Sequence, residues 1–249
     1  MQNSEKVNFG YESVTKDEKT KRVGAVFDSV ATRYDLMNNL MSFGIHHLWK
    51  KLTIELAHVR PKQVILDLAS GTGDLAIKLA EKVGNTGHVI AADINKSMLK
   101  IGRARLIDKG FLNQVTYVEA NAEALPLESN TVDMIFMAFG LRNVTDKVKA
   151  LSSMFRVCKP GGKLIILEFT NPQNPLVKSI YDWYSFKVLP LLGKFVADDE
   201  ASYKYLAESI RVHPTPEVLK NMIENAGFED CTYTLWTQGV VAMHVAYKY

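Results

Sequence analysis

The sequence predicts an α/β fold with a doubly wound, mostly parallel sheet of seven strands. Three observations carry this prediction. Apolar strand runs alternate with amphipathic helical patterns between residues 64 and 169, the first run ends in a glycine-rich turn, and two further strand runs close the chain as a hairpin. With 249 residues, 47% of them apolar, the chain is long enough for one large domain, expected over residues 23–249.

The segment before the first strand is expected to contain a mobile polar tail over residues 1–22 and a helical lid over residues 23–60. The tail mixes charges and lacks an apolar core like that of a signal peptide. In the lid, apolar residues recur at helical spacing over residues 23–41, with a break at 35–39, and again over residues 45–58. Helices in this position can cover the ends of the strands.

The central strands are short and apolar, as expected for strands buried on both faces of a sheet. Helical patterns follow the strands, and this βαβ rhythm implies a parallel sheet whose ligand lies at the carboxyl ends of the strands. The expected strands cover residues 64–69, 88–94, 115–120, 132–139 and 163–169, and the expected helices are one opened by Asp74 and those over residues 96–109 and 146–158.

The rhythm breaks after Thr170. Residues 171–214 are expected to form a helical insertion for substrate or membrane, before a helix over 216–226 and hairpin strands over 228–236 and 240–247. The insertion contains an aromatic stripe. Such stripes are most often core, and a surface for a lipid tail or a membrane is the alternative. The stripe consists of Tyr181, Trp183, Tyr184, Phe186 and Leu191, accompanied by Lys178, Lys187 and Lys194.

A glycine-rich turn at the end of the first strand is the main ligand-binding signal. Residues 64–74 read VILDLASGTGD, so that Gly71 and Gly73 precede a helix whose first N–H groups point at a ligand. The turn departs from the dinucleotide pattern G-x-G-x-x-G and is flanked by Asp67 and Asp74. Two carboxylates suit an amino group or a sulfonium better than a pyrophosphate. The expected cofactor is therefore S-adenosylmethionine (SAM).

Three polar residues near the turn have a functional and a structural interpretation. Asp93 ends the second strand, about twenty residues past the glycines, where a carboxylate can accept from both ribose hydroxyls or simply cap a helix. Asp67 either holds the amides of the turn or binds the methionine amino group. Asn121 either contacts the adenine side or is an ordinary turn residue.

The chain resembles the ubiquinone/menaquinone-biosynthesis C-methyltransferase family, within the class I SAM-dependent methyltransferases. The blocks RYDLMNNLMSFGIHHLW and FGLRNVTD are far more specific than the glycine turn and KPGG, which are common to many methyltransferases. The resemblance implies a Rossmann-like fold and methylation of a ring carbon of a polyprenylated benzoquinol or naphthoquinol. It also implies that Thr72 in the turn, Asp93 at the ribose, and Asn121 and Ala122 near the adenine contact SAM. The matching blocks cover residues 27–49, 66–76, 92–103, 121–127, 139–151, 159–169, 205–214 and 239–249.

Five residues are candidates for the chemical step. Arg142 follows the fourth strand, where a guanidinium can stabilise a phenolate instead of being solvated. Tyr34 has the spacing of a core residue, but its hydroxyl could equally contact SAM or the quinol. His46, His47 and His213 titrate in the range useful for a base, although a lone histidine is more often structural. Arg142 and Tyr34 are the preferred catalytic candidates.

Composition argues against several functions. A net charge of +3 without a basic run gives no sign of nucleic-acid binding. Cys158 and Cys231 are expected to be buried and unpaired, which fits a reducing cytoplasm, and no cluster of metal-binding side chains is apparent. No apolar stretch reaches the roughly twenty residues of a membrane span. We therefore expect a cytoplasmic protein, with a peripheral position on the inner face of the membrane as an open alternative.

Other functions and partners stay open at this point. The same fold could methylate a phenol oxygen, or the chain could be a non-catalytic SAM-binding subunit of a quinone-synthesis complex. A dinucleotide-dependent reductase is disfavoured because G-x-G-x-x-G is missing. The expected small-molecule partner is a polyprenylated quinol, and a quinone-biosynthesis enzyme complex and a homodimer are further alternatives.

Overall fold

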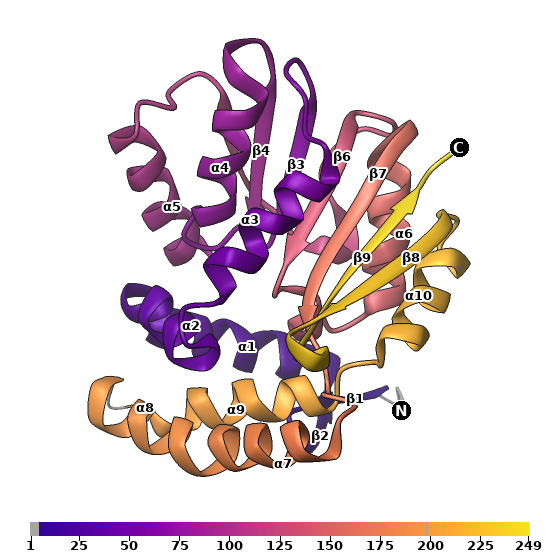
Figure 1. The fold of residues 1–249 in the computed structure, drawn as a ribbon. Helices are drawn as coiled ribbons and strands as arrows, with labels where there is room; N and C mark the ends of the chain where they lie inside the picture. The colour runs from indigo at the N-terminus through magenta and orange to yellow at the C-terminus, as the bar shows by residue number, and fades with distance from the viewer. Residues whose placement is uncertain (1–4, 198) are drawn as a thin grey trace.

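A seven-stranded sheet runs through the molecule, and helices cover both of its faces (Figure 1). This computed structural model describes residues 5–197 and 199–249. The strand order is β5-β4-β3-β6-β7-β9-β8, and β9 is antiparallel to both neighbours whereas the other pairs are parallel. The predicted fold class is therefore confirmed. The strands are β3 (Val64–Leu68), β4 (His88–Asp93), β5 (Val115–Glu119), β6 (Val132–Ala138), β7 (Cys158–Phe169), β8 (Glu229–Trp236) and β9 (Val241–Tyr247).

The strand β3 marks the point where the chain changes direction across the sheet. It pairs with β4 on one side and with β6 on the other. Its residues Ile65, Leu66 and Leu68 are almost fully buried, because helices cover the strand from both faces. In doubly wound sheets, ligands bind in the crevice beyond the carboxyl ends of the strands at such a point.

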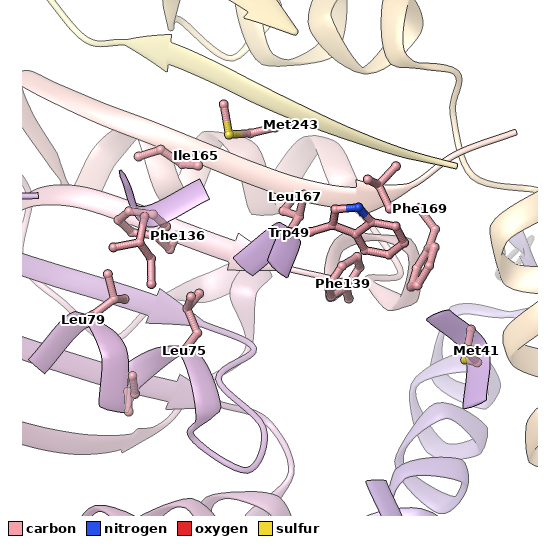
Figure 2. Close-up of a cluster of buried hydrophobic side chains, with 14 of the residues drawn as sticks. Met41, Trp49, Leu75, Leu79, Phe136, Phe139, Ile165, Leu167, Phe169 and Met243 are labelled. Atoms are coloured by element: carbon pink, nitrogen blue, oxygen red, sulfur yellow. The ribbon is translucent and has the colours of Figure 1, made fainter. Parts of the chain in front are cut away.

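Two hydrophobic cores lie on opposite faces of the sheet. On one face, α3 and α4 pack over the strands, and Figure 2 shows Trp49 of α3 and Leu75 of α4 among the strand side chains. On the other face, α6 and α10 contribute residues such as Leu151 and Ile223. The helices that flank the sheet are α3 (His46–Ala57), α4 (Asp74–Val83), α5 (Lys96–Asp108), α6 (Lys147–Val157) and α10 (Pro216–Asn225).

A layer of helices lies beyond the carboxyl ends of the parallel strands (Figure 1). Helices from the N-terminal segment and from the insertion contact one another there, although they are far apart in the sequence. Both segments were predicted to be helical, and both are. The layer contains α1 (Lys16–Val30), α2 (Tyr34–Ser42), α7 (Pro175–Trp183), the π-helical segment η5 (Tyr184–Val188), α8 (Leu189–Ala197) and α9 (Glu200–Arg211).

The prediction of a polar tail over residues 1–22 is wrong from residue 6 onward. A two-stranded hairpin, β1 (Lys6–Phe9) and β2 (Glu12–Thr15), leads directly into α1. Phe9 is buried, and its ring stacks on that of Tyr205 in α9 with the centroids 4.2 Å apart. The hairpin is thus held by a partner far along the chain, which local sequence does not reveal. The first four residues of the predicted tail lie outside the described residues.

The predicted helix break at residues 35–39 is also wrong. Helix α2 continues through these residues, and the interruption lies at η1 (Ala31–Arg33), a short 3₁₀ turn between α1 and α2. The polar sequence DLMNN favours a turn locally. Met37 and Asn38 are buried in the helical layer, however, and this packing keeps the segment helical.

Candidate active site

A cleft of about 850 Å³, including its open mouth, lies at the carboxyl ends of β3, β4 and β6. The strand ends form one wall, and α1 with the start of α2 forms the other, so the helical layer covers the cleft. This is the usual ligand-binding crevice of a doubly wound sheet. The strand-end wall includes Leu68, Ala69, Asp93, Ala120, Met137 and Phe139.

The glycine turn predicted from sequence forms one side of this cleft. Gly71 has φ +56°, and a side chain there would place its Cβ 3.3 Å from Cε of Met98 and 3.7 Å from Cε1 of Tyr34. Gly73 has φ +79°, and its Cβ would lie 3.2 Å from Cα of Gly102 in α5. Glycine is therefore required at both positions for conformation and for space, and it lets a ligand approach the main chain.

Asp93 is hydrogen-bonded to the glycine turn and also lines the cleft. Its Oδ2 accepts a hydrogen bond from the Gly71 amide and its Oδ1 one from the Asn95 amide, both at 2.8 Å. Burial raises the pKa of Asp93, and these amide hydrogen bonds act in the opposite direction. A carboxylate offers about four lone-pair positions, so both oxygens can still accept from a ligand. The geometry fits a pair of adjacent hydroxyls.

Asp67 lies directly behind the wall of the cleft, two residues before Ala69. Its side chain is fully buried, and its Oδ2 has no hydrogen-bond partner within the described chain. Burial raises the pKa of Asp67 to about 8, and the nearby Lys50 ammonium acts against this rise. A buried carboxyl oxygen without a partner is costly, so a cationic ligand group next to it would be stabilised.

Asn121 and Ala122, which follow β5, both line the cleft. The Asn121 Oδ1 accepts from the Glu123 amide at 2.9 Å and caps the short 3₁₀ turn η3 (Ala122–Ala124). Its side-chain NH₂ remains a donor. Ile94 and Met98 provide apolar surface beside these residues, so this part of the cleft suits a flat ring with polar edges.

The chain matches a known protein family over almost its whole length. The family model described as the ubiE/COQ5 methyltransferase family matches residues 14–248. The chain belongs to this family. It is 61% identical, over 242 residues and 97% of each chain, to a Legionella pneumophila protein named ubiquinone/menaquinone biosynthesis C-methyltransferase UbiE. A protein of that name from Teredinibacter turnerae is 56% identical over 248 residues and 100% of each chain.

Solved structures with a similar fold are more distant. A SAM-dependent methyltransferase from Thermotoga maritima has a TM-score of 0.63 at 18% identity, covering 90% of this chain and 99% of that one. Another from Aquifex aeolicus has a TM-score of 0.57 at 20% identity, covering 79% and 88%. At these identities the similarity shows the fold alone, which is the Rossmann-like fold of class I methyltransferases.

Family membership makes the chain a methyltransferase that uses SAM, and the predicted cofactor is confirmed. Residues in the cleft wall and directly behind it fit this molecule. The unpartnered oxygen of Asp67 suits the methionine ammonium, Asp93 suits two ribose hydroxyls, and the bare backbone at Gly71 leaves room for the ligand.

Thr72 of the methyltransferase does not line the cleft, in contrast to the role implied by the family resemblance. Its side chain is buried and donates from Oγ1 to Oδ1 of Asp35 in α2 at 3.1 Å. Asp35 also pairs with Arg105 of α5 at 2.6 Å. Thr72 therefore connects the glycine turn to the helical layer above it.

Tyr34 lies in the cleft wall opposite the strand ends, close to Gly71. Asn143, which the sequence analysis missed, lines the same region, and its Oδ1 accepts from the Tyr205 hydroxyl at 3.1 Å. The only available signal for Asn143 was its position directly after Arg142, in a loop at the carboxyl end of a strand. Tyr34 and Asn143 thus contribute two polar side chains to the lining of the cleft.

Arg142 is buried behind the cleft, not exposed in it. Its guanidinium donates to Oε1 of Glu168 at 2.8 Å and to the carbonyl oxygen of Phe139 at 2.5 Å. Its backbone amide donates to Oε2 of Glu168 at 3.1 Å. Burial acts to lower the pKa of Arg142, but the Glu168 carboxylate outweighs burial and the pKa is raised. The direct contact with a phenolate expected from the sequence is therefore not seen in this conformation.

The three candidate histidines lie away from the cleft walls of the described chain. Burial lowers the pKa of His46 to about 4, and its Nδ1 is 2.8 Å from Oγ of Ser42. His47 is exposed at the surface, with Nδ1 3.9 Å from Oδ2 of Asp74. Burial holds the pKa of His213 well below its usual value. Their positions favour the structural interpretation of all three.

Lys50 is a further residue that the sequence analysis missed. It lies on α3 and donates from Nζ to Oδ2 of Asp74, the first residue of α4, at 3.0 Å. Burial raises the pKa of Asp74, but Lys50 outweighs it and the pKa is lowered to about 2. Lys50 thus neutralises the charge of Asp74 beside the glycine turn. Nothing in its local sequence marks it, because the partner is in another helix.

Proposed function

We propose that this methyltransferase transfers the methyl group of SAM to a ring carbon of a polyprenylated quinol. The substrate would be demethylmenaquinol, giving menaquinol, or 2-polyprenyl-6-methoxy-1,4-benzoquinol, giving its methylated product. One observation carries the proposal: relatives named ubiquinone/menaquinone biosynthesis C-methyltransferase are 56–61% identical over 97–100% of this chain. Such identity over the full length includes the specific blocks around Tyr34 and Arg142.

The polar residues of the cofactor end have distinct tasks in this proposal. Asp93 binds the ribose hydroxyls, Asp67 accepts the methionine ammonium, and Asn121 with Ala122 bounds the adenine. SAM, when bound, supplies an electrophilic methyl group. The protein must then bring a carbon nucleophile into line with that group and keep water away.

In this proposal the quinol ring lies against the part of the cleft wall formed by Tyr34, Phe139 and Asn143. A ring carbon is a weak nucleophile until a hydroxyl ortho or para to it loses its proton, so the site must stabilise a phenolate. The Asn143 NH₂ group is free to donate, because only its oxygen accepts from Tyr205. The Tyr34 hydroxyl can donate as well, and the rings of Phe27 and Phe139 exclude water.

Arg142 acts on the chemical step as a positioning residue in this proposal. It binds the Phe139 carbonyl and Glu168, and through them fixes the 3₁₀ turn η4 (Leu141–Asn143) at the edge of the cleft. Phe139 has φ +61°, an unusual conformation for a residue other than glycine. The hydrogen bond from Arg142 to the Phe139 carbonyl oxygen stabilises this conformation, and so helps to hold Phe139 and Asn143 in place.

We further propose peripheral contact with a membrane through α7. Leu176, Ile180 and Trp183 repeat at helical spacing on its exposed side, with exposed fractions of 69%, 59% and 62%. The aromatic stripe predicted from sequence is therefore partly surface and partly core. Trp183 is exposed, whereas the Tyr184 hydroxyl points inward and donates to the Leu40 carbonyl oxygen at 2.7 Å. No helix in the described part of the chain is long and apolar enough to cross a membrane.

Vesicle flotation tests the membrane proposal. Wild-type protein should float with vesicles that contain anionic lipid, and salt should weaken this binding because Lys178 and Lys187 are screened. Replacing Ile180 and Trp183 with serine should reduce flotation, whereas Leu112→Ser, at an exposed leucine after α5, should not. Equal flotation of both variants and the wild type would contradict the proposal.

Product analysis tests the proposed reaction. Purified enzyme, SAM and a demethylated quinol should give a product whose new methyl group is attached to a ring carbon. A methyl ether would instead identify an O-methyltransferase. Binding of S-adenosylhomocysteine without turnover of benzoquinols or naphthoquinols would identify a non-catalytic subunit.

A further inference from the structure

One side of helix α1 belongs to the lining of the cleft, and a glycine lies in the middle of this side. The residues of α1 that line the cleft are Thr20, Val23, Gly24 and Phe27. They are spaced at i, i+3, i+4 and i+7, so they share one face of the helix. Among them, Gly24 has no side chain and therefore presents bare backbone to the cleft.

Neither the conformation of Gly24 nor its packing requires a glycine. Gly24 lies in the interior of an α-helix, where glycine is less favourable than alanine. Apart from its chain neighbours and the backbone of its own helix, a Cβ atom built there would meet no atom of the described chain within 4 Å. In the glycine turn, by contrast, a Cβ at Gly71 would lie 3.3 Å from Cε of Met98. The open space in front of Gly24 therefore needs another explanation, which a bound ligand supplies.

Two hydrogen bonds hold α1 on either side of Gly24. Asp28 accepts through Oδ1 from the side-chain amide of Asn95 at 2.9 Å. The hydroxyl oxygens of Thr20 and Thr145 are hydrogen-bonded at 3.2 Å. Thr20, Gly24 and Asp28 are spaced at i, i+4 and i+8, so they follow one another along the same side of the helix. Gly24 therefore lies midway between the two contacts.

Both contacts lead to the part of the cleft that is proposed to hold adenosine. Asn95 follows the proposed ribose ligand Asp93 by two residues. Thr145 precedes Asp146, whose backbone amide donates to Oε1 of Glu123 at 2.9 Å. Glu123 is in η3, the turn that carries part of the proposed adenine site. The middle of α1 is therefore held across the adenosine part of the cleft.

We propose that the backbone of α1 at Gly24 is the wall against which the adenine ring of SAM packs, and that this contact requires a small residue. The inference rests on the cofactor position in the proposed function and adds a contact on α1 to it. The face of an adenine ring needs no hydrogen-bond partner, and a bare backbone lets it approach closely. Ile94, which is 49% exposed, adds apolar surface to the same cleft, and Asn121 is left to bind the polar edge of the ring.

Packing on the other side of α1 opposes any movement of the helix away from the cleft. That side contacts α9, where the hydroxyl oxygens of Ser29 and Ser202 are 3.1 Å apart. Val30, at the end of α1, is 1% exposed and belongs to the hydrophobic core. Figure 1 shows α1 between the ends of the strands and α9. A larger side chain in place of Gly24 would therefore occupy the space of the ligand.

Calorimetric titration of the full-length protein with S-adenosylhomocysteine tests the contact. Gly24→Leu should weaken binding at least about tenfold, whereas Gly24→Ala, which adds one methyl group, should weaken it about threefold or less. Ala25→Leu, at an exposed position of the same helix, is the matched control and should bind like wild type. Leucine and alanine favour a helix more than glycine does, so the melting temperatures of both Gly24 variants without ligand should equal or exceed that of wild type.

The outcomes separate this inference from the cofactor position on which it rests. Wild-type affinity in a stable Gly24→Leu variant would overturn the proposal. Wild-type affinity together with a raised KM for the quinol would also overturn it, and would assign the space in front of Gly24 to the substrate. If Asp93→Ala loses affinity and Gly24→Leu does not, the contact on α1 alone is wrong. If neither variant loses affinity, the cofactor lies elsewhere and both assignments fail.

A smaller ligand tests whether the contact is with the adenosine part of the cofactor. Methylthioadenosine shares the adenosine of S-adenosylhomocysteine but lacks its amino-acid part. Gly24→Leu should weaken the binding of both ligands by the same factor, whereas Asp67→Asn should weaken the binding of S-adenosylhomocysteine alone. A loss confined to S-adenosylhomocysteine in Gly24→Leu would place Gly24 beside the methionine part and overturn the adenine contact.

Discussion

The two ends of the cleft handle buried charge in opposite ways. At the β3–β4 end, Asp93 faces the cleft and Asp67 keeps an oxygen without a partner in the described chain. At the β6–β7 end, Arg142 and Glu168 neutralise each other inside the protein. The first arrangement leaves polar groups available to a charged cofactor. The second arrangement uses the Arg142–Glu168 pair to hold the backbone of Phe139 and Arg142 in place.

This difference has an energetic basis. Hydrogen bonding and charge pairing offset the cost of burying ions, so the charges of Arg142 and Glu168 are balanced without a ligand, although Nε of Arg142 has no hydrogen-bond partner in the described chain. Asp67 is incomplete, and burial therefore keeps its proton bound, with a pKa of about 8. The proposed cofactor end thus leaves a buried carboxyl for a ligand to complete, whereas the β6–β7 end has its charges already paired within the chain and is in this sense preformed. Variants at the two ends should consequently fail in different ways.

The largest effect is expected from Arg142→Ala, which breaks the preformed end. It leaves Glu168 buried and uncompensated, so the free energy of unfolding should fall by about 3–5 kcal/mol. Urea denaturation measures this change. The double variant Arg142→Met, Glu168→Leu should lose less than Arg142→Ala, because neither charge remains. If the double variant is as unstable as Arg142→Ala, the loss of stability comes from lost packing and not from the unpaired charge of Glu168.

The second effect is expected from Asp93→Ala, which breaks the ligand-completed end. Binding of S-adenosylhomocysteine should weaken by at least about 2 kcal/mol, or roughly thirtyfold, because two hydroxyls lose a charged acceptor. Isothermal titration calorimetry measures it, with Glu119→Gln at the exposed end of β5 as the control. Wild-type affinity in a folded Asp93→Ala variant would remove Asp93 from the cofactor site.

The third prediction concerns pH. The pKa of Asp67 is raised from 3.8 to about 8 in the folded protein, so its proton stays bound there while the unfolded chain loses it. Unfolding then releases a proton, and stability should decline as pH rises from about 4 to about 8. Asp67→Asn should remove this part of the decline, by an amount on the order of a few kcal/mol. Denaturation of both proteins at several pH values is the measurement, and parallel curves would contradict it.

The smallest effect is expected from Thr72→Val, which disconnects the glycine turn from α2. The lost hydrogen bond to Asp35 should weaken binding of S-adenosylhomocysteine by about 1 kcal/mol or less. Thr116→Val, which removes a hydroxyl bonded to His88 on the surface, is the matched control. A loss as large as that of Asp93→Ala would place Thr72 in direct contact with the cofactor.

The sequence was most informative where the chemistry is local. The strand, glycine turn and helix over residues 64–83 are contiguous, and Asp93 ends the next strand, so spacing alone placed them together. The sheet and the helical insertion followed from periodicity in the same way. These features need no knowledge of distant partners.

The sequence was least informative where distant segments meet. Nothing near Arg142 indicates that Glu168 will pair with it, and nothing near Phe9 indicates that Tyr205 will bury it. For the same reason Thr72 was assigned to the cofactor, although its hydroxyl bonds to Asp35. Pairings of this kind depend on tertiary packing, which composition and periodicity do not contain.

The most direct test of the account is the position of the transferred methyl group. Wild-type enzyme would be incubated with SAM carrying a ¹³C-labelled methyl group and a demethylated polyprenyl quinol, and the product examined by NMR. The account predicts that the label is bonded to a ring carbon, with the Asp93→Ala variant giving little product. A label on oxygen, or no labelled quinol from an enzyme that binds S-adenosylhomocysteine, would contradict the account.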